Sequence, residues 1–315
     1  MCTPAHSSQP ETQSAPAVTV LMAVRNGLPH LRAAAASVLA QTFRNLEFLV
    51  VDDGSTDDTP AFLTSLARTD SRVRQVRNDQ NLGLTRSLLR GMQESRGECI
   101  ARLDADDIAM PGRLQAQASF MRDHPDVLVL GGGHEQFIDS PPQPTTAAPT
   151  HDGVEEVSFS SLLERNRFCH SSAIFRRRLI AQGLTYREPF VRSQDYDLWL
   201  RVALAGRVAT LQRTVCLYRR AAEAVSLRHM HEQLRFAELA RLLARERQIT
   251  GTDMLDRIGA FPPLPADVKR RIQRQSGAAL VYFAQRMAGA GRSGSACRLL
   301  GRALVANPAL AIREI

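Results

Sequence analysis

Short apolar runs alternate with amphipathic segments over the first 130 residues of the chain. The runs VTVLMAV (18–24) and LEFLVV (46–51) are almost wholly apolar, which is typical of strands that are covered on both faces. Between them, residues 28–43 carry apolar side chains at helical spacing. Further strands are expected near 73–77, 99–103 and 127–130, with helices near 82–95 and from Pro111. This alternation predicts a Rossmann-like, doubly wound α/β domain with a mostly parallel sheet.

Polar clusters follow three of the predicted strands at the point where each strand ends. RNG (25–27) follows the first strand, DDGS (52–55) the second, and DADD (104–107) the strand near 99–103. Doubly wound sheets bind ligands outside the carboxyl ends of their strands, at the crevice where the strand order reverses. We therefore expect the three clusters to share one rim and to form a ligand site, whereas one isolated aspartate would usually be a turn or a helix cap.

The remainder of the chain differs in pattern from this alternating part. Residues 139–153 are rich in Pro and Thr and predict a flexible connector or a lid. Apolar positions such as Val225 and Leu227 begin an amphipathic helical pattern, which ends in a helix pair at about 276–289 and 293–306. The expected organisation is a disordered N-terminal tail (1–17), an α/β domain (18–222) and a basic helical C-terminal extension (223–315).

The positive charge of the chain is concentrated near its end. The 315 residues are 44% hydrophobic and 23% charged, as in a globular protein, and the net charge is +8. Residues 223–315 hold 15 Arg or Lys against 8 Asp or Glu. Such a segment could face nucleic acid, anionic lipid or an acidic acceptor, or it could be a solvated helix surface. Few aromatics (5%) and the lack of a recognised motif argue against nucleic acid.

The cysteines and the N-terminus point to a reducing compartment. The five cysteines are scattered without C-x-x-C spacing, so neither a disulfide framework nor a zinc site is predicted. Residues 1–17 lack the apolar centre of a signal peptide, and no stretch approaches the roughly 18 apolar residues of a membrane span. A cytoplasmic location is expected, with the basic region offering peripheral attachment to the inner face of the cytoplasmic membrane.

Asp104 and Asp106 are separated by one residue and are candidates for metal chemistry. One carboxylate of such a pair can bind Mg²⁺ or Mn²⁺ while the other reaches a neighbouring hydroxyl, and substrate phosphates and water complete the coordination. Carboxylates alone would repel a diphosphate, so a cation is needed, and the cation also makes the diphosphate a better leaving group. The alternative is an acidic turn that caps the helix from Pro111.

Five segments together resemble the inverting nucleotide-sugar glycosyltransferases of family 2, which have the GT-A fold. In order they are VTVLMAVRNG, SVLAQTFRNLEFLVVDDGSTDDT, NLGL, GECIARLDADDIAMPGRL and SQDYDLWLRV. The resemblance implies a hexosyltransferase that uses a UDP-, GDP- or dTDP-sugar and a divalent cation. The implied acceptor is a hydroxyl of a cell-surface glycan or lipid-linked precursor in cell-envelope polysaccharide biosynthesis. Because the Q-x-x-R-W signature of processive synthases is absent, transfer of one sugar per encounter is expected.

The resemblance also implies roles for residues on the donor side. Ala23 and Arg25 would flank the nucleotide base, and Arg25 stands where an aromatic is common, so the base would stack on a guanidinium. Asp53 would accept a hydrogen bond from the base. Asp104 would contact the ribose or the sugar, and Asp106 would be the metal ligand. Without the resemblance, a cap of the next helix is the favoured role for Asp52 or Asp53.

On the acceptor side, Asp195 in QDYDLW matches the general base that takes the proton of the attacking hydroxyl. Configuration should then invert. Family members commonly have Glu before this Asp, and the neutral Gln194 should leave Asp195 more acidic and a slightly weaker base. His170 either contacts the acceptor or diphosphate or is a packed side chain. Arg219 and Arg220 are candidates for phosphate contacts or for a surface role.

Two other classes of function are compatible with parts of this pattern. A nucleotidyltransferase would use a related sheet, but it normally needs a glycine-rich loop with a basic residue after the first strand, and RNGLPHL supplies one glycine. A non-catalytic nucleotide-sugar-binding or nucleic-acid-binding protein is the third possibility. The enzyme hypothesis requires Asp53, Asp106 and Asp195 to face one shared cleft.

Overall fold

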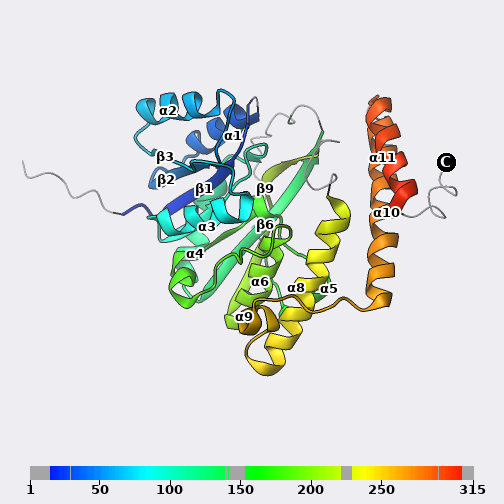
Figure 1. Ribbon diagram of the computed structural model, residues 1–315. Coiled ribbons are helices and arrows are strands. Elements are labelled where there is room, and N and C mark those ends of the chain that lie inside the picture. The colour runs from blue at the N-terminus through cyan, green and yellow to red at the C-terminus, as the bar shows by residue number, and fades with distance from the viewer. Residues whose placement is uncertain are drawn as a thin grey trace, which may run out of the picture.

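The computed structural model describes residues 15–28, 30–138, 141, 153–220, 229–289 and 291–306. They form an α/β domain whose sheet has helices on both faces, followed by a helical C-terminal region (Figure 1). Most of the expected tail and of the Pro-rich connector, as well as Val225 and Leu227, lies outside these residues. The predicted disorder of the tail and flexibility of the connector therefore remain predictions.

The elements are named here with their bounds. The strands are β1 (Val18–Val24), β2 (Leu46–Asp52), β3 (Val73–Arg77), β4 (Cys99–Arg102), β5 (Ile108–Ala109), β6 (Val127–Phe137), β7 (Val154–Glu156), β8 (Ile174–Arg176) and β9 (Arg207–Arg219). The α-helices are α1 (His30–Leu39), α2 (Thr59–Thr69), α3 (Leu84–Glu94), α4 (Arg113–Asp123), α5 (Phe159–Glu164), α6 (Gln194–Ala205), α8 (Met230–Thr250), α9 (Met254–Ile258), α10 (Ala266–Gly289) and α11 (Ser293–Ala306). Two short 3₁₀ turns, η1 (His170–Ser172) and η2 (Arg177–Gln182), flank β8.

The described residues form a nine-stranded sheet in the order β3-β2-β1-β4-β8-β6-β9-β5, with β7 paired to β9. Strands β3, β2, β1 and β4 are parallel, and Val18 of β1 pairs with Leu46 on one side and Cys99 on the other. From β1 the chain moves outward through β2 to β3 and then returns to β4 on the opposite side of β1. The strand order therefore reverses between β1 and β4, where a doubly wound sheet has its ligand crevice. The predicted fold class is confirmed.

Apolar side chains cover both faces of the sheet, which explains why β1 and β2 are apolar throughout. Every residue of these two strands is buried. One face packs against α1, α2 and α4, and the other against α3, α5, α6 and α8. Trp199 of α6 has no exposed surface and lies at the centre of the second layer, as expected for a core residue.

Strand β6 continues to Phe137, beyond the end at 130 that the apolar run predicts. The predicted strand stops before the glycines at 131–133, since glycine is a poor strand former. Here they permit close packing: a Cβ at Gly131 would lie 2.3 Å from the Phe168 ring, and one at Gly132 would lie 2.4 Å from Val215. The extension lets β6 run beside β9 as far as the edge of the crevice, where Phe137 pairs with Arg219.

Helices α10 and α11 form a hairpin that stands beside the rest of the molecule (Figure 1). Helix α10 begins at Ala266, ten residues before the predicted start, because Val268 and Ile272 continue its buried face. The hairpin has an apolar cluster of its own, which Ile138 joins from the end of β6: Leu280, Val281, Ala284, Met287, Ala296, Leu299 and Ala303. None of the helices that the structure describes is long and apolar enough to cross a bilayer.

Candidate active site

A cleft of about 420 Å³ opens where the strand order reverses. The end of β1 and the turn after it, the turn after β4, the end of β9 and the first residues of α1 and α3 line it: Ala23, Val24, Arg25, Asn26, Gly27, Leu28, His30, Leu84, Asp104, Ala105, Asp106, Tyr218 and Arg219. Four of the predicted donor-site residues, Ala23, Arg25, Asp104 and Asp106, therefore share one cleft. The sequence indicated the RNG and DADD clusters but gave no signal for His30 or Tyr218.

Hydrogen bonds to the next polar cluster hold the turn after β1 in place. The Asn26 amide donates to Ser55 Oγ at 2.9 Å, and Asn26 Oδ1 accepts from the amide of Thr56 at 2.9 Å. Asn26 has φ +51°, a left-handed conformation that asparagine tolerates better than most residues. The first two polar clusters thus form one rim, with Arg25 exposed at its edge.

The Asp53 carboxylate is directed away from the cleft lining and toward the loop before α3. Its Oδ1 accepts hydrogen bonds from Asn78 Nδ2 and the Leu82 amide, both at 2.8 Å, and its Oδ2 accepts one from the Gly83 amide at 2.9 Å. The Asp53 amide donates to Val24 O at 2.8 Å, so only its backbone adjoins the cleft. In this structure Asp53 fixes the loop, and its hydrogen bond to a nucleotide base stays a prediction.

Asp104 is held by a buried arginine that the sequence analysis missed. Arg102 has no exposed surface, pairs with Asp104 and also donates to Leu21 O at 2.9 Å. Ser171 Oγ donates to Asp104 Oδ2 at 3.1 Å. Burial alone would raise the pKa of Asp104, but the charge of Arg102 and the hydrogen bonds from Arg102 and Ser171 hold it below its ordinary value. Asp104 is therefore an ionised carboxylate in a fixed orientation.

The pKa values of the two neighbouring aspartates, Asp106 and Asp107, are shifted in the opposite direction, upward. Burial, reinforced by the charge of Asp104, raises the pKa of Asp106 to about 6. Burial and the charges of Asp104 and Asp106 raise the pKa of Asp107 as well. Asp107 Oδ1 accepts from the Arg219 amide at 2.8 Å, which ties the rim to the end of β9. The three aspartates at 104–107 thus carry more negative charge than the positive groups around them neutralise.

This donor set fits a hard divalent cation that the substrate helps to bind. Within the described parts of the chain, no three His, Cys, Asp or Glu side chains are grouped so that the protein alone could cage a metal. Mg²⁺ and Mn²⁺ are usually bound through one or two carboxylates, with phosphate oxygens and water as the other ligands. Asp106 and Asp104 are the carboxylates of the cleft lining that could hold such a cation, and this role stays a prediction.

Asp195 lies in the first turn of α6 and is partly accessible, but it is not among the residues that line the cleft. Of the three aspartates that were expected to face one cleft, only Asp106 lines it. Its Oδ2 accepts a hydrogen bond from Asn166 Nδ2 at 3.1 Å. Burial raises the pKa of Asp195 to about 6, and the charge of Asp104 acts in the same direction. Gln194 was expected to leave Asp195 more acidic, but the larger influence in the structure is burial, which makes this carboxylate a stronger base than a solvated aspartate.

His170 and Tyr186 occupy the space between the two sets of carboxylates. Tyr186 Oη and His170 Nε2 lie 2.8 Å apart, and the His170 ring also packs edge-on against Trp199. Burial and the charge of Arg102 lower the pKa of His170 to about 3, so the imidazole is neutral. The charges of Asp195 and Asp104 both raise the pKa of Tyr186, which burial raises most. The structure therefore shows His170 as a packed side chain, and its contact with the acceptor or the diphosphate stays a prediction.

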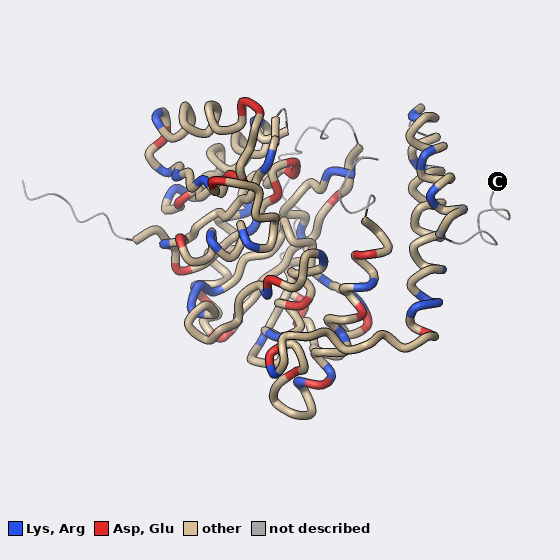
Figure 2. The backbone as a smooth tube through the Cα atoms, in the orientation of Figure 1, with Lys and Arg blue, Asp and Glu red and all other residues tan. Residues whose placement is uncertain are grey.

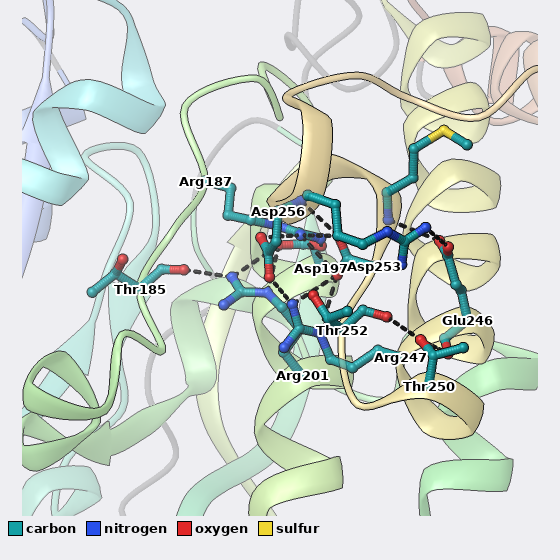
Figure 3. A network of polar contacts seen from close by, with 12 residues as sticks. Thr185, Arg187, Asp197, Arg201, Glu246, Arg247, Thr250, Thr252, Asp253 and Asp256 are labelled. Carbon is teal, nitrogen blue, oxygen red and sulfur yellow. Dashed lines mark hydrogen bonds and ion pairs between the residues drawn. The ribbon is translucent and has the colours of Figure 1, made fainter.

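A network of ion pairs supports the helix that carries Asp195 (Figure 3). Asp197 lies two residues after Asp195 in α6 and pairs with both Arg187 and Arg201. Arg187 also binds Asp253 of the α8–α9 connection at 2.9 Å. Tyr186 is adjacent to Arg187 in the chain. The network therefore fixes the position of Tyr186 relative to the start of α6 and to helices α8 and α9.

Two arginines at the end of β9 border the cleft. Arg219 lines it, stacks on Phe137 with the guanidinium 4.5 Å from the ring centroid, and donates from Nε to Asp106 O at 3.2 Å. Arg220 lies between the rings of Tyr218, at 4.9 Å, and Phe283 of α10, at 5.0 Å. Positive charge thus borders the acidic rim, and Arg220 connects the cleft wall to the C-terminal hairpin.

The fold and this cleft define a GT-A type, nucleotide-sugar-dependent glycosyltransferase. The model of the family described as "Glycosyl transferase family 2" matches residues 19–184, more than half of the chain. The chain belongs to this family and is a glycosyltransferase that uses nucleotide-sugar donors. Membership favours glycosyl transfer over nucleotidyl transfer and over a purely binding role.

Named relatives agree with this assignment. The chain is 26% identical over 245 residues, 74% of each chain, to an uncharacterized glycosyltransferase of Haemophilus influenzae. It is 27% identical over 194 residues, 62% of this chain and 72% of the other, to the UDP-Glc:alpha-D-GlcNAc-diphosphoundecaprenol beta-1,3-glucosyltransferase WfgD of Escherichia coli. The structure of S. aureus TarS 1-349 in complex with UDP-GlcNAc aligns over 90% of each chain with a TM-score of 0.57 at 14% identity, which is a likeness of fold.

Proposed function

We propose that the chain is an inverting, metal-dependent and non-processive glycosyltransferase that moves a hexose from a nucleotide-sugar to an acceptor hydroxyl. The observation that carries the proposal is the state of Asp195. Its carboxylate is partly accessible, and burial raises the pKa of this group to about 6. The negative charge of Asp104, on the rim of the cleft, raises the pKa further. A general base near the donor carboxylates is what a single displacement requires.

On the donor side, Ala23 and Arg25 would flank the base, and the ionised Asp104 would contact the ribose or the sugar in the orientation that Arg102 and Ser171 impose. Asp106 would hold Mg²⁺ or Mn²⁺. When bound, that cation neutralises the diphosphate and makes it a better leaving group. Arg219 adds a positive charge at the same edge of the cleft.

On the acceptor side, Asp195 would take the proton of the acceptor hydroxyl. The hydroxyl oxygen forms a bond to the anomeric carbon as the bond from that carbon to the diphosphate breaks on the opposite face, so the configuration inverts. A pKa of about 6 leaves Asp195 mostly deprotonated at neutral pH while keeping it more basic than a solvated aspartate. The Asn166 amide fixes the orientation of the carboxylate.

For the acceptor we propose a lipid-linked or cell-surface glycan precursor in cell-envelope polysaccharide biosynthesis. The name of the relative WfgD, which specifies a UDP-sugar donor and a diphosphoundecaprenol-linked acceptor, supports this choice. The enzyme would then work in the cytoplasm at the inner face of the membrane, with a UDP-, GDP- or dTDP-sugar as donor.

The direct test is a panel of UDP-, GDP-, CDP- and dTDP-sugars scored for nucleotide release with Mg²⁺, with Mn²⁺ and with a chelator. We expect one donor class to support release, the chelator to abolish it, and the product to have the anomeric configuration opposite to that of the donor by NMR. Full release in the chelator would refute the metal role. A product that retains the donor configuration would refute the single displacement.

A further inference from the structure

The hairpin of α10 and α11 is the most unevenly charged part of the described structure. Residues 266–306 contain one acidic side chain, Asp267, against eight basic ones: Lys269, Arg270, Arg271, Arg274, Arg286, Arg292, Arg298 and Arg302. Figure 2 shows basic residues along the hairpin and acidic colour only near the end where α10 begins. The hairpin cannot neutralise this charge within itself.

Most of the basic residues are exposed, because the apolar faces of the two helices pack against each other: Lys269, Arg270, Arg274, Arg286 and Arg298. Along α10, Arg274, Ala278, Tyr282 and Arg286 recur every four residues and all are exposed, so they share one face of the helix. Tyr282 is 52% exposed and accepts a hydrogen bond from Arg286 Nη1 at 3.2 Å. The face therefore combines positive charge with an accessible aromatic ring.

The hairpin has defined contacts with the catalytic part of the molecule. Phe283 of α10 packs on Arg220, whose other side packs on the cleft residue Tyr218. Arg271 pairs with Glu238 of α8 at 3.0 Å, and Ile138 at the end of β6 joins the apolar cluster of the hairpin. Whatever binds the outer face of the hairpin is therefore held at a fixed place relative to the donor cleft.

We propose that this outer face of α10, formed by Arg270, Arg274, Tyr282 and Arg286, together with the exposed Arg298 of α11, docks the enzyme on an anionic lipid bilayer. Negatively charged headgroups complement these four arginines, and each Lys or Arg near such a bilayer raises affinity about fivefold. Tyrosine is enriched at membrane interfaces, where its ring is buried and its hydroxyl stays hydrated. The inference deepens the proposed function, because a lipid-linked acceptor is presented at such a surface.

The test is vesicle sedimentation with the full chain and a charge-reversal variant, Arg274→Glu/Arg286→Glu/Arg298→Glu. The wild type should pellet with vesicles of phosphatidylcholine and phosphatidylglycerol at low salt, and it should dissociate as salt is raised. The variant should bind roughly a hundredfold more weakly or worse. Binding to pure phosphatidylcholine that equals binding to the anionic vesicles, or no binding to either, would overturn the proposal.

A matched control has the same change in net charge elsewhere: Arg68→Glu/Arg122→Glu/Arg178→Glu, three exposed positions on α2, α4 and η2. It should bind vesicles as the wild type does. An equal loss in both variants would show that net charge, and not the hairpin, determines binding. Tighter binding to an RNA oligonucleotide than to vesicles, or a change of oligomeric state in the hairpin variant alone, would assign the face to another partner.

Nucleotide release with a water-soluble acceptor analogue, without vesicles, separates this inference from the proposed function. The hairpin variant should retain wild-type release and a wild-type melting temperature, because its three positions lie outside the cleft. A wild type that binds vesicles but transfers no sugar would refute the function and leave docking intact. A wild type that transfers sugar but ignores anionic vesicles would refute docking alone.

Discussion

Two groups of carboxylates in this protein differ in their partners. In the network around α6, Asp197 and Asp253 are almost wholly buried, and each pairs with two guanidinium groups. In the second group, Asp104 on the rim of the cleft has one arginine partner, whereas the pKa of Asp106 on the same rim and of Asp195 in α6 is raised to about 6. The second group is partly accessible, and its charges have fewer partners than those of the first.

The difference separates a structural use of charge from a chemical one. Buried carboxylates that are fully paired fix neighbouring elements and become costly to disrupt. Buried carboxylates without sufficient partners have a high affinity for protons or cations, which is the property that a base or a metal ligand needs. Substitutions in the two groups should therefore fail in different ways.

The largest effect is expected for Asp195→Asn. The amide keeps the shape of the side chain but cannot accept the proton, so transfer should fall by about 10²- to 10⁴-fold. Donor affinity, measured by isothermal titration calorimetry, and the melting temperature should stay close to the wild type. Asp267→Asn on α10 is the control and should transfer normally. Unchanged transfer in Asp195→Asn would place the base elsewhere.

A smaller but still large loss is expected for Asp106→Asn. Removing the charge that would bind the cation should lower nucleotide release about a hundredfold or more. The circular dichroism spectrum should be unchanged, because asparagine keeps the size and shape of the side chain. Asp126→Asn, an exposed residue paired with Arg207, serves as the control. Near-normal release in Asp106→Asn would exclude the metal role.

In the network around α6, the substitution Arg187→Met should act on stability. It leaves Asp197 and Asp253 short of a partner, and breaking a buried pair in this way costs about 3–5 kcal/mol of unfolding free energy. Urea denaturation measures the change. Arg257→Met removes an exposed pair with Glu246 and should cost little. Equal losses for the two variants would mean that burial of the network is unimportant.

The smallest effect concerns pH. Asp195 acts when deprotonated, so transfer should be retained above pH 6 and lost as pH falls through about 6. Asp104 and Tyr186 face this carboxyl, and the nearby His170 stays neutral over the range. Gln194→Glu places a second acid beside it and should shift the acidic limb upward by less than about one pH unit. An unmoved limb would assign it to another group.

The clustering of Ala23, Arg25, Asp104 and Asp106 in one cleft could be predicted from the sequence because its determinants are local. Apolar runs mark the parallel strands, and the polar residues directly after them must meet at the crevice between β1 and β4. The direction of the Asp53 carboxylate was not predictable, since it depends on a loop that passes Gly54 so closely that a Cβ there would lie 2.7 Å from Gln80 C. That packing belongs to the tertiary structure.

The supporting half was less accessible to sequence reasoning. Arg102 lies in an apolar strand, and the pattern of the chain does not mark it as a site residue. Its position two residues before Asp104 is the one feature of the sequence that indicates the pairing. Tyr186 and Arg187 belong to a segment without a motif, and Arg187 meets a partner 66 residues away in Asp253. Pairings at such separation follow from how α6, α8 and α9 pack, which the pattern along the chain does not contain.

The separate apolar cluster of the terminal hairpin has an evolutionary consequence. Because these two helices are stabilised mostly by each other, their outer residues can drift without disturbing the sheet or the chemistry at its edge. Substitution of a few exposed arginines of the hairpin would then change the surface to which the enzyme binds without changing its active site.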